Sequence, residues 1–220
     1  MESPVHINPE LSATKAPRRA FFNARAADWD SPERERQMQD GLARFVAASR
    51  CDRVSGIAEP RCILDVGCGT GVLVPHLLAA YSQAEVVIEL DFAEQMLERN
   101  RSRFSDARLV RMAGDATDLL LPTGAVDLAV CFNSAPHLGQ DEAAFRDLFR
   151  VLAPDGIIAV GHLKCSRELN RVHGRHAAPI AQDRLPLAPA LAAIFTSLGG
   201  VDVVAEECPG WYFVRANKPA

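Results

Sequence analysis

Three glycines at alternate positions follow a short apolar run, and this feature constrains the fold more than any other. The stretch is residues 63–72, which read Ile-Leu-Asp-Val-Gly-Cys-Gly-Thr-Gly-Val, and a predicted helix follows it. Glycine adopts positive φ and allows a ligand to approach the backbone closely, and a helix N-terminus offers free N–H groups to an anion. The stretch therefore predicts a strand, a loop and a helix that bind a nucleotide-like ligand at the carboxyl end of the strand. The alternative is a tight turn that binds no ligand.

The spacing of the glycines indicates which of the known nucleotide-binding loops this stretch resembles. In the dinucleotide fingerprint G-x-G-x-x-G, counted from Gly67 and Gly69, the third glycine would stand where the chain has Val72. A Walker loop needs Gly-Lys-Ser/Thr, which does not follow these glycines. The pattern D-x-G-x-G-x-G from Asp65 to Gly71 remains. It resembles motif I of the class I S-adenosylmethionine-dependent methyltransferases.

Strand-like and helix-like stretches alternate from residue 62 onward. The predicted strands cover residues 62–66, 85–91, 108–112, 127–132 and 156–163, and the helices between them cover 72–80, 93–104 and 141–152. This alternation predicts βαβ units and a mostly parallel sheet that is covered on both faces. A helix over 188–198 and strands over 201–206 and 211–216 follow. Because a parallel crossover needs a dozen residues or more, these last two strands must be antiparallel. We expect a Rossmann-like, doubly wound α/β sheet of seven mostly parallel strands with an antiparallel C-terminal hairpin.

The chain before the sheet has a different composition. Residues 1–17 are interrupted by prolines, and we expect them to form a flexible N-terminus. Residues 20–50 read as two helices, divided at Ser31-Pro32-Glu33, which resembles an N-cap followed by proline at the first helical position. We therefore expect a helical lid over residues 18–58 and the sheet within residues 59–220. Together they form one domain, although 220 residues would also suffice for two small ones.

Composition excludes several classes of protein. The chain is 48% hydrophobic and 24% charged, which is ordinary for a globular protein and excludes a disordered chain or a fibre. Its formal charge of −4 argues against a nucleic-acid partner. No run approaches the roughly 20 apolar residues of a membrane span, and we expect no membrane partner. The six cysteines form no C-x-x-C pair. We expect a reduced, cytoplasmic protein that is a monomer or a homodimer.

The resemblance to class I methyltransferases extends through most of the chain. Residues 91–97 look like the family's D-x-S-x-x-M-L segment, with Ala93 in place of serine, and residues 114–116 resemble its G-D-A. Residues 126–130 are similar to the F-D-x-V strand. Residues 150–156 are similar to R-V-L-K-P-G-G, with Asp155 in place of the first glycine. The order and spacing of these segments make the resemblance specific, although each segment alone is weak.

The resemblance implies S-adenosyl-L-methionine as the cofactor and assigns residues to it. Gly67, Cys68, Gly69 and Gly71 would lie along its methionine portion, and Asp65 would order that loop and the cofactor's amino group. Asp91 would bind both ribose hydroxyls. Phe92 would pack on the adenine, with Met96 in the same set of residues, and Asp115 and Ala116 would read the adenine edge. The alternatives are a helix N-cap for Asp91 and a turn residue for Asp115.

Methyl transfer from a sulfonium is an in-line displacement, so the protein mainly positions the acceptor and excludes water. Candidate catalytic residues are Asn133 and His137, in the loop after the fourth strand, and His173. Asn133 is expected near both the cofactor and the methyl group. His137 would orient the acceptor or remove a proton, since histidine titrates near neutral pH. The alternative is that His137 packs against the helix that follows.

Candidate acceptor-binding residues come from two further segments. After the fifth strand, His162, Asn170 and His173 belong to a stretch that resembles S-R-x-x-L/I-N-x-x-H of small bacterial methyltransferase-like proteins. If Ser166 caps a helix, Asn170 and His173 share its face, and the alternative is a solvated face. Residues 21–30 resemble the F-D-x-x-A-x-x-Y/W-D opening of small-molecule methyltransferases, in which Phe22 and Trp29 would line a lid. The alternative for those two is a core-facing aromatic stripe.

Two other readings of these segments are weaker. His162, Cys165, His173 and His176 are acceptable zinc ligands, but their spacing fits no zinc module, so we expect no metal. The arginines between Arg99 and Arg111 read as a solvated helix face.

The sequence therefore predicts a methyltransferase that acts on a small-molecule acceptor. One alternative is an RNA- or protein-directed methyltransferase. The Asn/Asp-Pro-Pro-aromatic tetrad of amino-methylating enzymes is replaced by Asn133-Ser134-Ala135-Pro136. The other alternative is a non-catalytic protein that binds S-adenosylmethionine.

Overall fold

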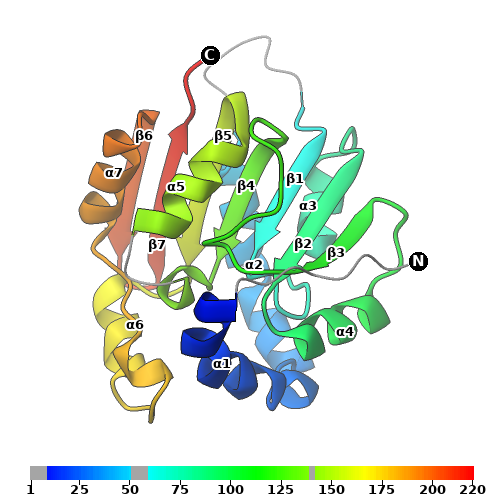
Figure 1. The fold of residues 1–220 in the computed structure, drawn as a ribbon, viewed down its shortest axis with the longest axis vertical. Coiled ribbons are helices and arrows are strands. Elements are labelled where there is room, and N and C mark those ends of the chain that lie inside the picture. Colours follow the sequence, from blue (N-terminus) through cyan, green and yellow to red (C-terminus); the bar gives the residue numbers. More distant parts are fainter. Residues whose placement is uncertain (1–8, 51–58, 139–141) are drawn as a thin grey trace.

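The computed structural model describes residues 9–50, 59–138 and 142–220, which fold around one seven-stranded sheet (Figure 1). The strands run in the order β3-β2-β1-β4-β5-β7-β6. Their bounds are β1 Cys62–Val66, β2 Val86–Asp91, β3 Leu109–Ala113, β4 Val126–Phe132, β5 Leu152–His162, β6 Val201–Cys208 and β7 Trp211–Asn217. Strands β1 to β5 pair in parallel, and β7 is antiparallel to both β5 and β6. The predicted Rossmann-like sheet with a C-terminal hairpin is confirmed.

Helices cover both faces of the sheet and also lie at the carboxyl ends of its parallel strands (Figure 1). Their bounds are α1 Pro9–Asn23, α2 Pro32–Ala48, α3 Val74–Ala80, α4 Glu94–Arg103, α5 Glu142–Val151, α6 Ser166–His173 and α7 Ala188–Ser197. Short 3₁₀ turns lie at Ala26–Asp28, Ala135–His137 and Ile180–Gln182. Helices α5 and α7 lie on one face of the sheet, and α2 and α3 lie on the other. Helix α1 lies below the carboxyl ends of the strands, beside α4 and α6.

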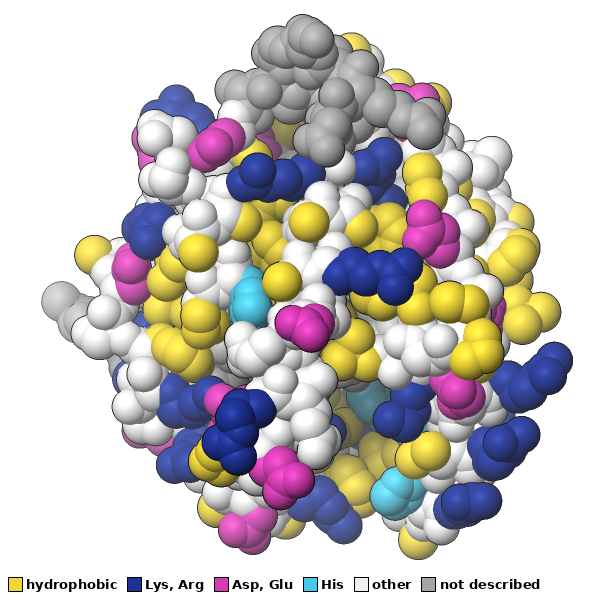
Figure 2. Space-filling view, turned by 180° about the vertical axis from the view of Figure 1, so that it is seen from behind, with side chains coloured by type: hydrophobic (Ala, Val, Ile, Leu, Met, Phe, Trp, Pro, Cys, Tyr) yellow, Lys and Arg dark blue, Asp and Glu magenta, His cyan; other side chains and the backbone are white. Residues whose placement is uncertain are grey.

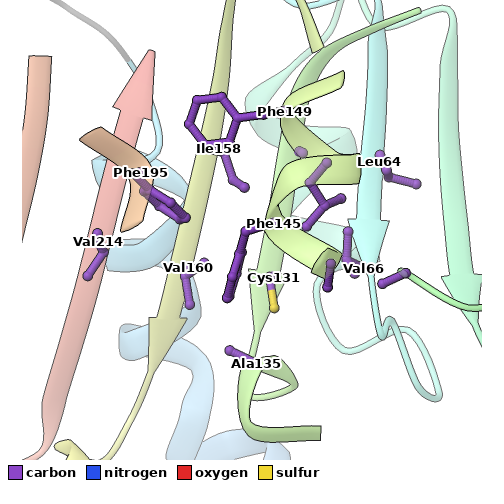
Figure 3. Close-up of a cluster of buried hydrophobic side chains, with 14 of the residues drawn as sticks. Leu64, Val66, Cys131, Ala135, Phe145, Phe149, Ile158, Val160, Phe195 and Val214 are labelled. Carbon is purple, nitrogen blue, oxygen red and sulfur yellow. The ribbon is translucent and has the colours of Figure 1, made fainter. Parts of the chain in front are cut away.

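Apolar side chains fill the space on each side of the sheet. On one face, Phe145 and Phe149 of α5 and Phe195 of α7 point toward strand residues such as Ile158 and Val160 (Figure 3). The ring of Phe195 lies 5.5 Å from the rings of both Phe145 and Phe149. On the other face, residues of α2 and α3 pack against alternate residues of the same strands. Because both faces are buried, the strands are nearly continuous apolar runs.

The strand order reverses between β1 and β4, since the chain runs outward from β1 to β3 and then returns. Parallel sheets bind ligands at such a point, outside the carboxyl ends of the strands. The glycine loop leaves β1 at this point, and the turn at Ala135–His137 follows β4 close by. The fold therefore places the two most informative sequence segments at one end of the sheet.

Three local expectations differ from the structure. Helix α1 begins at Pro9, inside the segment 1–17 that was expected to be flexible, and it contains Pro17. Residues 1–8 lie outside the described residues. Helix α6 is capped by Cys165 instead of Ser166, whose backbone N–H and hydroxyl donate to Glu207. Strand β5 begins at Leu152, earlier than predicted.

The predicted break between two lid helices is confirmed, since Ser31 accepts a hydrogen bond from the backbone N–H of Arg34.

Candidate active site

A cavity of about 460 Å³ lies at the carboxyl ends of the central strands. Figure 2 shows this part of the surface hollowed, with a histidine side chain recessed in the hollow and basic side chains around it. Most of the predicted site residues line the cavity: Phe22, Trp29, Gly67, Cys68, Gly69, Asp91, Phe92, Met96, Asp115, Ala116, Asn133, His137, His162 and His173. Three predicted residues, Asp65, Gly71 and Asn170, are not among the residues that line it.

The glycine loop is held against the end of β2. The backbone N–H groups of Gly67 and Cys68 both donate to the carbonyl of Leu90, at 2.8 and 3.0 Å. Gly67 has a φ of 68°, and a Cβ atom there would lie 2.5 Å from the Cβ of Ser134. Gly69 has a φ of 55°, but the space beside it is open. The loop therefore needs glycine for its backbone at both positions, and at Gly69 it leaves room for a ligand.

Gly71 has a different role from the one that the resemblance implies. It has a φ of 85°, and a Cβ atom there would lie 2.6 Å from the Nδ2 of Asn100 in α4. The third glycine thus lets the loop pack closely on α4 and does not face the cavity. The structure therefore supports a packing role for Gly71, and its assignment to cofactor binding stays a prediction.

Asp91 joins the glycine loop to the cavity. Its Oδ2 accepts from the backbone N–H of Gly69 at 2.9 Å, and its Oδ1 accepts from Ala93 at 2.8 Å. The bond to Ala93 resembles the N-cap alternative, yet the carboxylate also lines the cavity. Burial raises the pKa of Asp91 to about 6, although these two bonds act in the opposite direction. Each carboxylate oxygen keeps further acceptor capacity, which a pair of ribose hydroxyls would use.

Two more carboxylates are buried beneath the glycine loop. Asp65 is 2% exposed, and its Oδ2 finds no hydrogen-bond partner among the described residues. Burial, followed by the charges of Glu89 and Asp91, raises the pKa of Asp65 well above its usual value. Asp65 is not among the residues that line the cavity, so its part in ordering the loop and the cofactor's amino group stays a prediction. Glu89 was not predicted as a site residue, although an acidic residue inside an otherwise apolar strand indicates a buried charge with a specific role.

Lys15 and Asp115, which both line the cavity, form an ion pair. Lys15 of α1 places its Nζ 2.7 Å from both oxygens of Asp115. Asp115 also accepts from the backbone N–H and the hydroxyl of Thr117, as the turn alternative predicted. Burial opposes ionisation of Asp115, but the bonds from Lys15 and Thr117 outweigh it, so the pKa of Asp115 is lowered. The predicted adenine-reading acid is therefore ionised and paired with Lys15 of α1.

His137 and His173, two of the histidines that line the cavity, lie close together. His137 places Nδ1 2.6 Å from Oδ2 of Asp183, and its ring centroid lies 5.0 Å from that of Phe22 and 5.2 Å from that of His173. His173 in turn places Nδ1 3.2 Å from the backbone carbonyl of Asp183. These ring contacts are with α1 and α6, whereas the packing alternative for His137 named the helix that follows it in the chain. Asp183 was not predicted, although it is the one acid in the sequence between Glu168 and Asp202.

His162 and Asn170 occupy unlike positions. His162 is 1% exposed, and its Nε2 finds no hydrogen-bond partner among the described residues. Burial, together with positive charge on His137 and His173, lowers the pKa of His162 to about 3, so the ring is neutral. Asn170 instead exchanges two hydrogen bonds with the backbone of Leu185, at 2.8 and 2.9 Å. These bonds occupy its amide, so its assignment to acceptor binding is corrected to a structural one.

The lid is anchored to the glycine loop. Asp30 accepts from the hydroxyl of Thr70 at 2.6 Å, and Arg103 of α4 pairs with both Asp30 and Glu35. Arg103 and Arg111 are partly buried and bonded, so the expected solvated arginine face is wrong for these two residues. Asn23 accepts from the backbone N–H of Gln95 at 3.0 Å and so replaces the cap contact that Ala93 cannot supply.

Two absences apply to the part of the chain that the structure describes. No group of three or more His, Cys, Asp or Glu side chains there could hold a metal ion, so the zinc ligands considered above do not converge. Within the same residues, no helix is both long and apolar enough to span a bilayer.

The parallel sheet, the glycine loop at the switch point and the acid at the end of β2 are typical of class I S-adenosylmethionine-dependent methyltransferase domains. In agreement, residues 63–156 match the family described as "Methyltransferase domain". The chain is 34% identical over 145 residues to a malonyl-[acyl-carrier protein] O-methyltransferase of Geobacter sulfurreducens, which covers 64% of this chain and 51% of that protein. It is 29% identical over 123 residues to a demethylmenaquinone methyltransferase of Chlamydia trachomatis, which covers 56% and 53%. The chain thus spans about half the length of these curated relatives.

Solved structures share the fold at low sequence identity. One is a putative methyltransferase in complex with the Trm112 methyltransferase activator of Haloferax volcanii, with a TM-score of 0.69, 16% identity, and coverage of 90% of this chain and 98% of that one. Another is phosphoethanolamine N-methyltransferase 2 of Haemonchus contortus in complex with S-adenosyl-L-methionine. Its TM-score is 0.66, with 15% identity and coverage of 82% and 53%.

Proposed function

We propose that the chain is an S-adenosylmethionine-dependent methyltransferase that transfers a methyl group to a small-molecule acceptor. The observation that carries this proposal is the cavity that the glycine loop and Asp91 line together with His137, His162 and His173. The loop and the carboxylate would hold a cofactor, and the histidine rings would face an acceptor. A cytoplasmic location and a monomeric or homodimeric state remain predictions.

The residues present fit the cofactor. Gly69 leaves open space beside the loop, and the Asp91 carboxylate can still accept from ribose hydroxyls. Phe92 offers an aromatic face, and Asp115 with Ala116 lies beyond it. A ligand with positive charge beside Asp91 would favour the ionised form of this buried carboxylate. When bound, S-adenosylmethionine supplies a methyl group on a sulfonium.

The chain's own residues would position the acceptor and exclude water. Phe22 of α1 and Trp29 close the cavity from the lid side, and their rings contact each other at 5.6 Å. Asn133 lies at the end of β4, where its side-chain oxygen accepts from the backbone N–H of Leu163. Such enclosure strengthens electrostatic interactions within the site and holds the reactants in line.

The size and lining of the cavity support a small acceptor. A volume of about 460 Å³ must accommodate both the cofactor and the reacting part of the acceptor. The named relatives methylate malonyl-[acyl-carrier protein] and demethylmenaquinone, so their acceptors include a carrier-bound group as well as a free molecule. Incubation of a small-molecule extract, RNA and protein separately with methyl-labelled cofactor would locate the label. We expect it in the small-molecule fraction, and label in RNA or protein alone would contradict a small acceptor.

Calorimetric titration with S-adenosylhomocysteine tests the cofactor site. We expect the wild type to bind, and Asp91→Asn to bind at least about tenfold more weakly, because it loses charge-assisted hydrogen bonds to the ribose. Asp202→Asn is the matched control, since Asp202 lies exposed at the start of β6 and far from the glycine loop in the sheet order. Absence of binding by the wild type would overturn the proposal.

A further inference from the structure

We propose that Asp183 and Arg18 hold His137 as the proton acceptor of the site, and that the acceptor molecule carries a weakly acidic hydroxyl group at its reacting atom. This inference rests on the proposed function and adds to it a positioning pair and a chemical class of acceptor.

The contact between His137 and Asp183 joins distant parts of the chain. His137 ends the turn after β4, and Asp183 follows the turn Ile180–Gln182 beyond α6. The Nδ1 of His137 and the Oδ2 of Asp183 lie 2.6 Å apart, a distance typical of a charge-assisted hydrogen bond. An ionised carboxylate can only accept, so Nδ1 carries the hydrogen. In the neutral ring this leaves the lone pair on Nε2.

Arg18 of α1 keeps Asp183 ionised. Its Nη2 donates to Oδ1 at 2.5 Å and its Nε donates to Oδ2 at 3.3 Å, while Asp183 is 3% exposed. Burial opposes ionisation of Asp183, but the bonds from His137 and Arg18 outweigh it, so the pKa of Asp183 is lowered. A buried carboxylate with two donors is rigid, and it is therefore suited to fix the tautomer and orientation of a ring.

The imidazole of His137 lies between two other rings. Phe22 of the lid meets it edge-on, with planes at 67°, and His173 of α6 lies against it with planes at 31°. His137 also lines the same cavity as Gly67 and Asp91. Because Nδ1 is directed to Asp183, the nitrogen that remains for the acceptor is Nε2.

The other histidines of the cavity are less suited to this role. His162 is enclosed, and its lowered pKa makes it a poor proton acceptor near neutral pH. The Nδ1 of His173 faces a backbone carbonyl, which cannot stabilise a charged ring as a carboxylate does. His137 alone among these three contacts a carboxylate in the described structure.

The chemical step balances with these groups. The acceptor hydroxyl gives its proton to Nε2 of His137, and its oxygen forms a bond to the methyl carbon. The bond between that carbon and the sulfonium sulfur breaks, and its electron pair stays on sulfur. The products are a methyl ether, S-adenosylhomocysteine and an imidazolium ion that Asp183 stabilises. A hydroxyl is the matching acceptor class, because a thiol or an amine of ordinary basicity depends less on a positioned base.

Nuclear magnetic resonance of ¹⁵N-labelled protein tests the positioning directly, without cofactor or acceptor. We expect the neutral His137 ring to carry its hydrogen on Nδ1 in the wild type, and to lose this preference in Asp183→Asn. A wild-type ring with its hydrogen on Nε2 would overturn the proposal. Since this measurement uses the free protein, its result is independent of whether S-adenosylhomocysteine binds.

Modification by diethyl pyrocarbonate separates positioning from support of the local structure. With exposed His176 as the internal reference, we expect His137 to react about tenfold more slowly in Asp183→Asn than in the wild type, because its Nε2 becomes less nucleophilic. If Asp183 merely pinned its segment, the variant would expose the ring, and His137 would react equally fast or faster. The matched control is Asp147→Asn, which removes another Asp–Arg pair, with Arg150, and should leave the rate unchanged.

Discussion

Glu89 is a fully buried carboxylate within β2, and it connects three elements beneath the glycine loop. Its Oε2 accepts from Nδ2 of Asn100 at 2.8 Å, and the amide oxygen of Asn100 accepts from Nε of Arg111 at 2.9 Å. Gly71 has no side chain at the point where Asn100 approaches. The network therefore explains why the third glycine of the loop faces α4.

The ionisation of Glu89 predicts how stability depends on pH. Burial raises its pKa to about 7, above the ordinary value for the unfolded chain. The unfolded state releases this proton at lower pH than the folded state, so the group's contribution to stability falls as pH rises from about 4.5 to 7. Relative to Glu89→Gln, we expect the wild type to lose on the order of 2 kcal/mol of unfolding free energy between pH 5 and pH 8.

Urea unfolding at several pH values measures this difference. Glu85→Gln is the control, because Glu85 belongs to the same segment but is exposed and pairs only with Arg61 among the described residues. Parallel stability curves for the wild type and Glu89→Gln would show that Glu89 is already ionised in the folded protein.

The positions of site residues could be predicted from the sequence where a short sequence pattern specifies them. Gly67, Gly69 and Asp91 lie in one local segment and its neighbouring strand, and the structure brings them together. Lys15, Arg18 and Asp183 were missed because their contacts join distant positions, 100 apart for Lys15 and Asp115, 165 for Arg18 and Asp183, and 46 for His137 and Asp183. No local periodicity encodes such pairs, so the single sequence did not reveal them.

At the scale of elements, α1 shows how tertiary contacts override local propensity. Its prolines argued for an irregular segment, but Lys15, Arg18 and Arg19 reach Asp115, Asp183 and Glu94 on three separate parts of the chain. Phe22 packs against Phe92 at 5.8 Å. The helix is therefore held by the site that it covers.

The position of Lys15 predicts that α1 competes with the cofactor. Since Lys15 covers both oxygens of Asp115, an adenine amino group can bind there after the lysine moves. We expect Lys15→Met to bind S-adenosylhomocysteine about fivefold more tightly, which corresponds to a pair of roughly 1 kcal/mol. Arg19→Met is the control, because its pair with Glu94 is more exposed and longer, at 3.9 Å. Equal or weaker binding by Lys15→Met would contradict the competition.

The strands could be predicted from the sequence because apolar runs and glycine turns are local features, whereas their order in the sheet was not predicted. The boundaries of the helices and strands were predicted less accurately. Ser166 was expected to cap α6, but it bonds to Glu207 of β6, which is 41 positions away. Asp155 has a φ of 61° within β5, in the place of the family's usual glycine, and this bend allowed the strand to begin earlier than predicted.

At the scale of the molecule, the sheet gathers charge that the total of −4 conceals. Asp91 at the end of β2 and Asp115 after β3 line the cavity together with histidines from the segment after β4, from β5 and from α6. In the strand order, β2 and β3 lie on one side of the switch point, and β4 and β5 lie on the other. The carboxylates and the histidines therefore come from opposite sides of the switch point.

A crystal structure of the protein with S-adenosylhomocysteine tests the central claim most directly. We expect the ribose hydroxyls to bind Asp91, the methionine portion to follow Gly67 and Gly69, and the sulfur to face the space beside Asn133 and His137. Lys15 should have left Asp115. Density for the ligand outside this cavity, or with its sulfur directed away from the histidines, would contradict the proposed site.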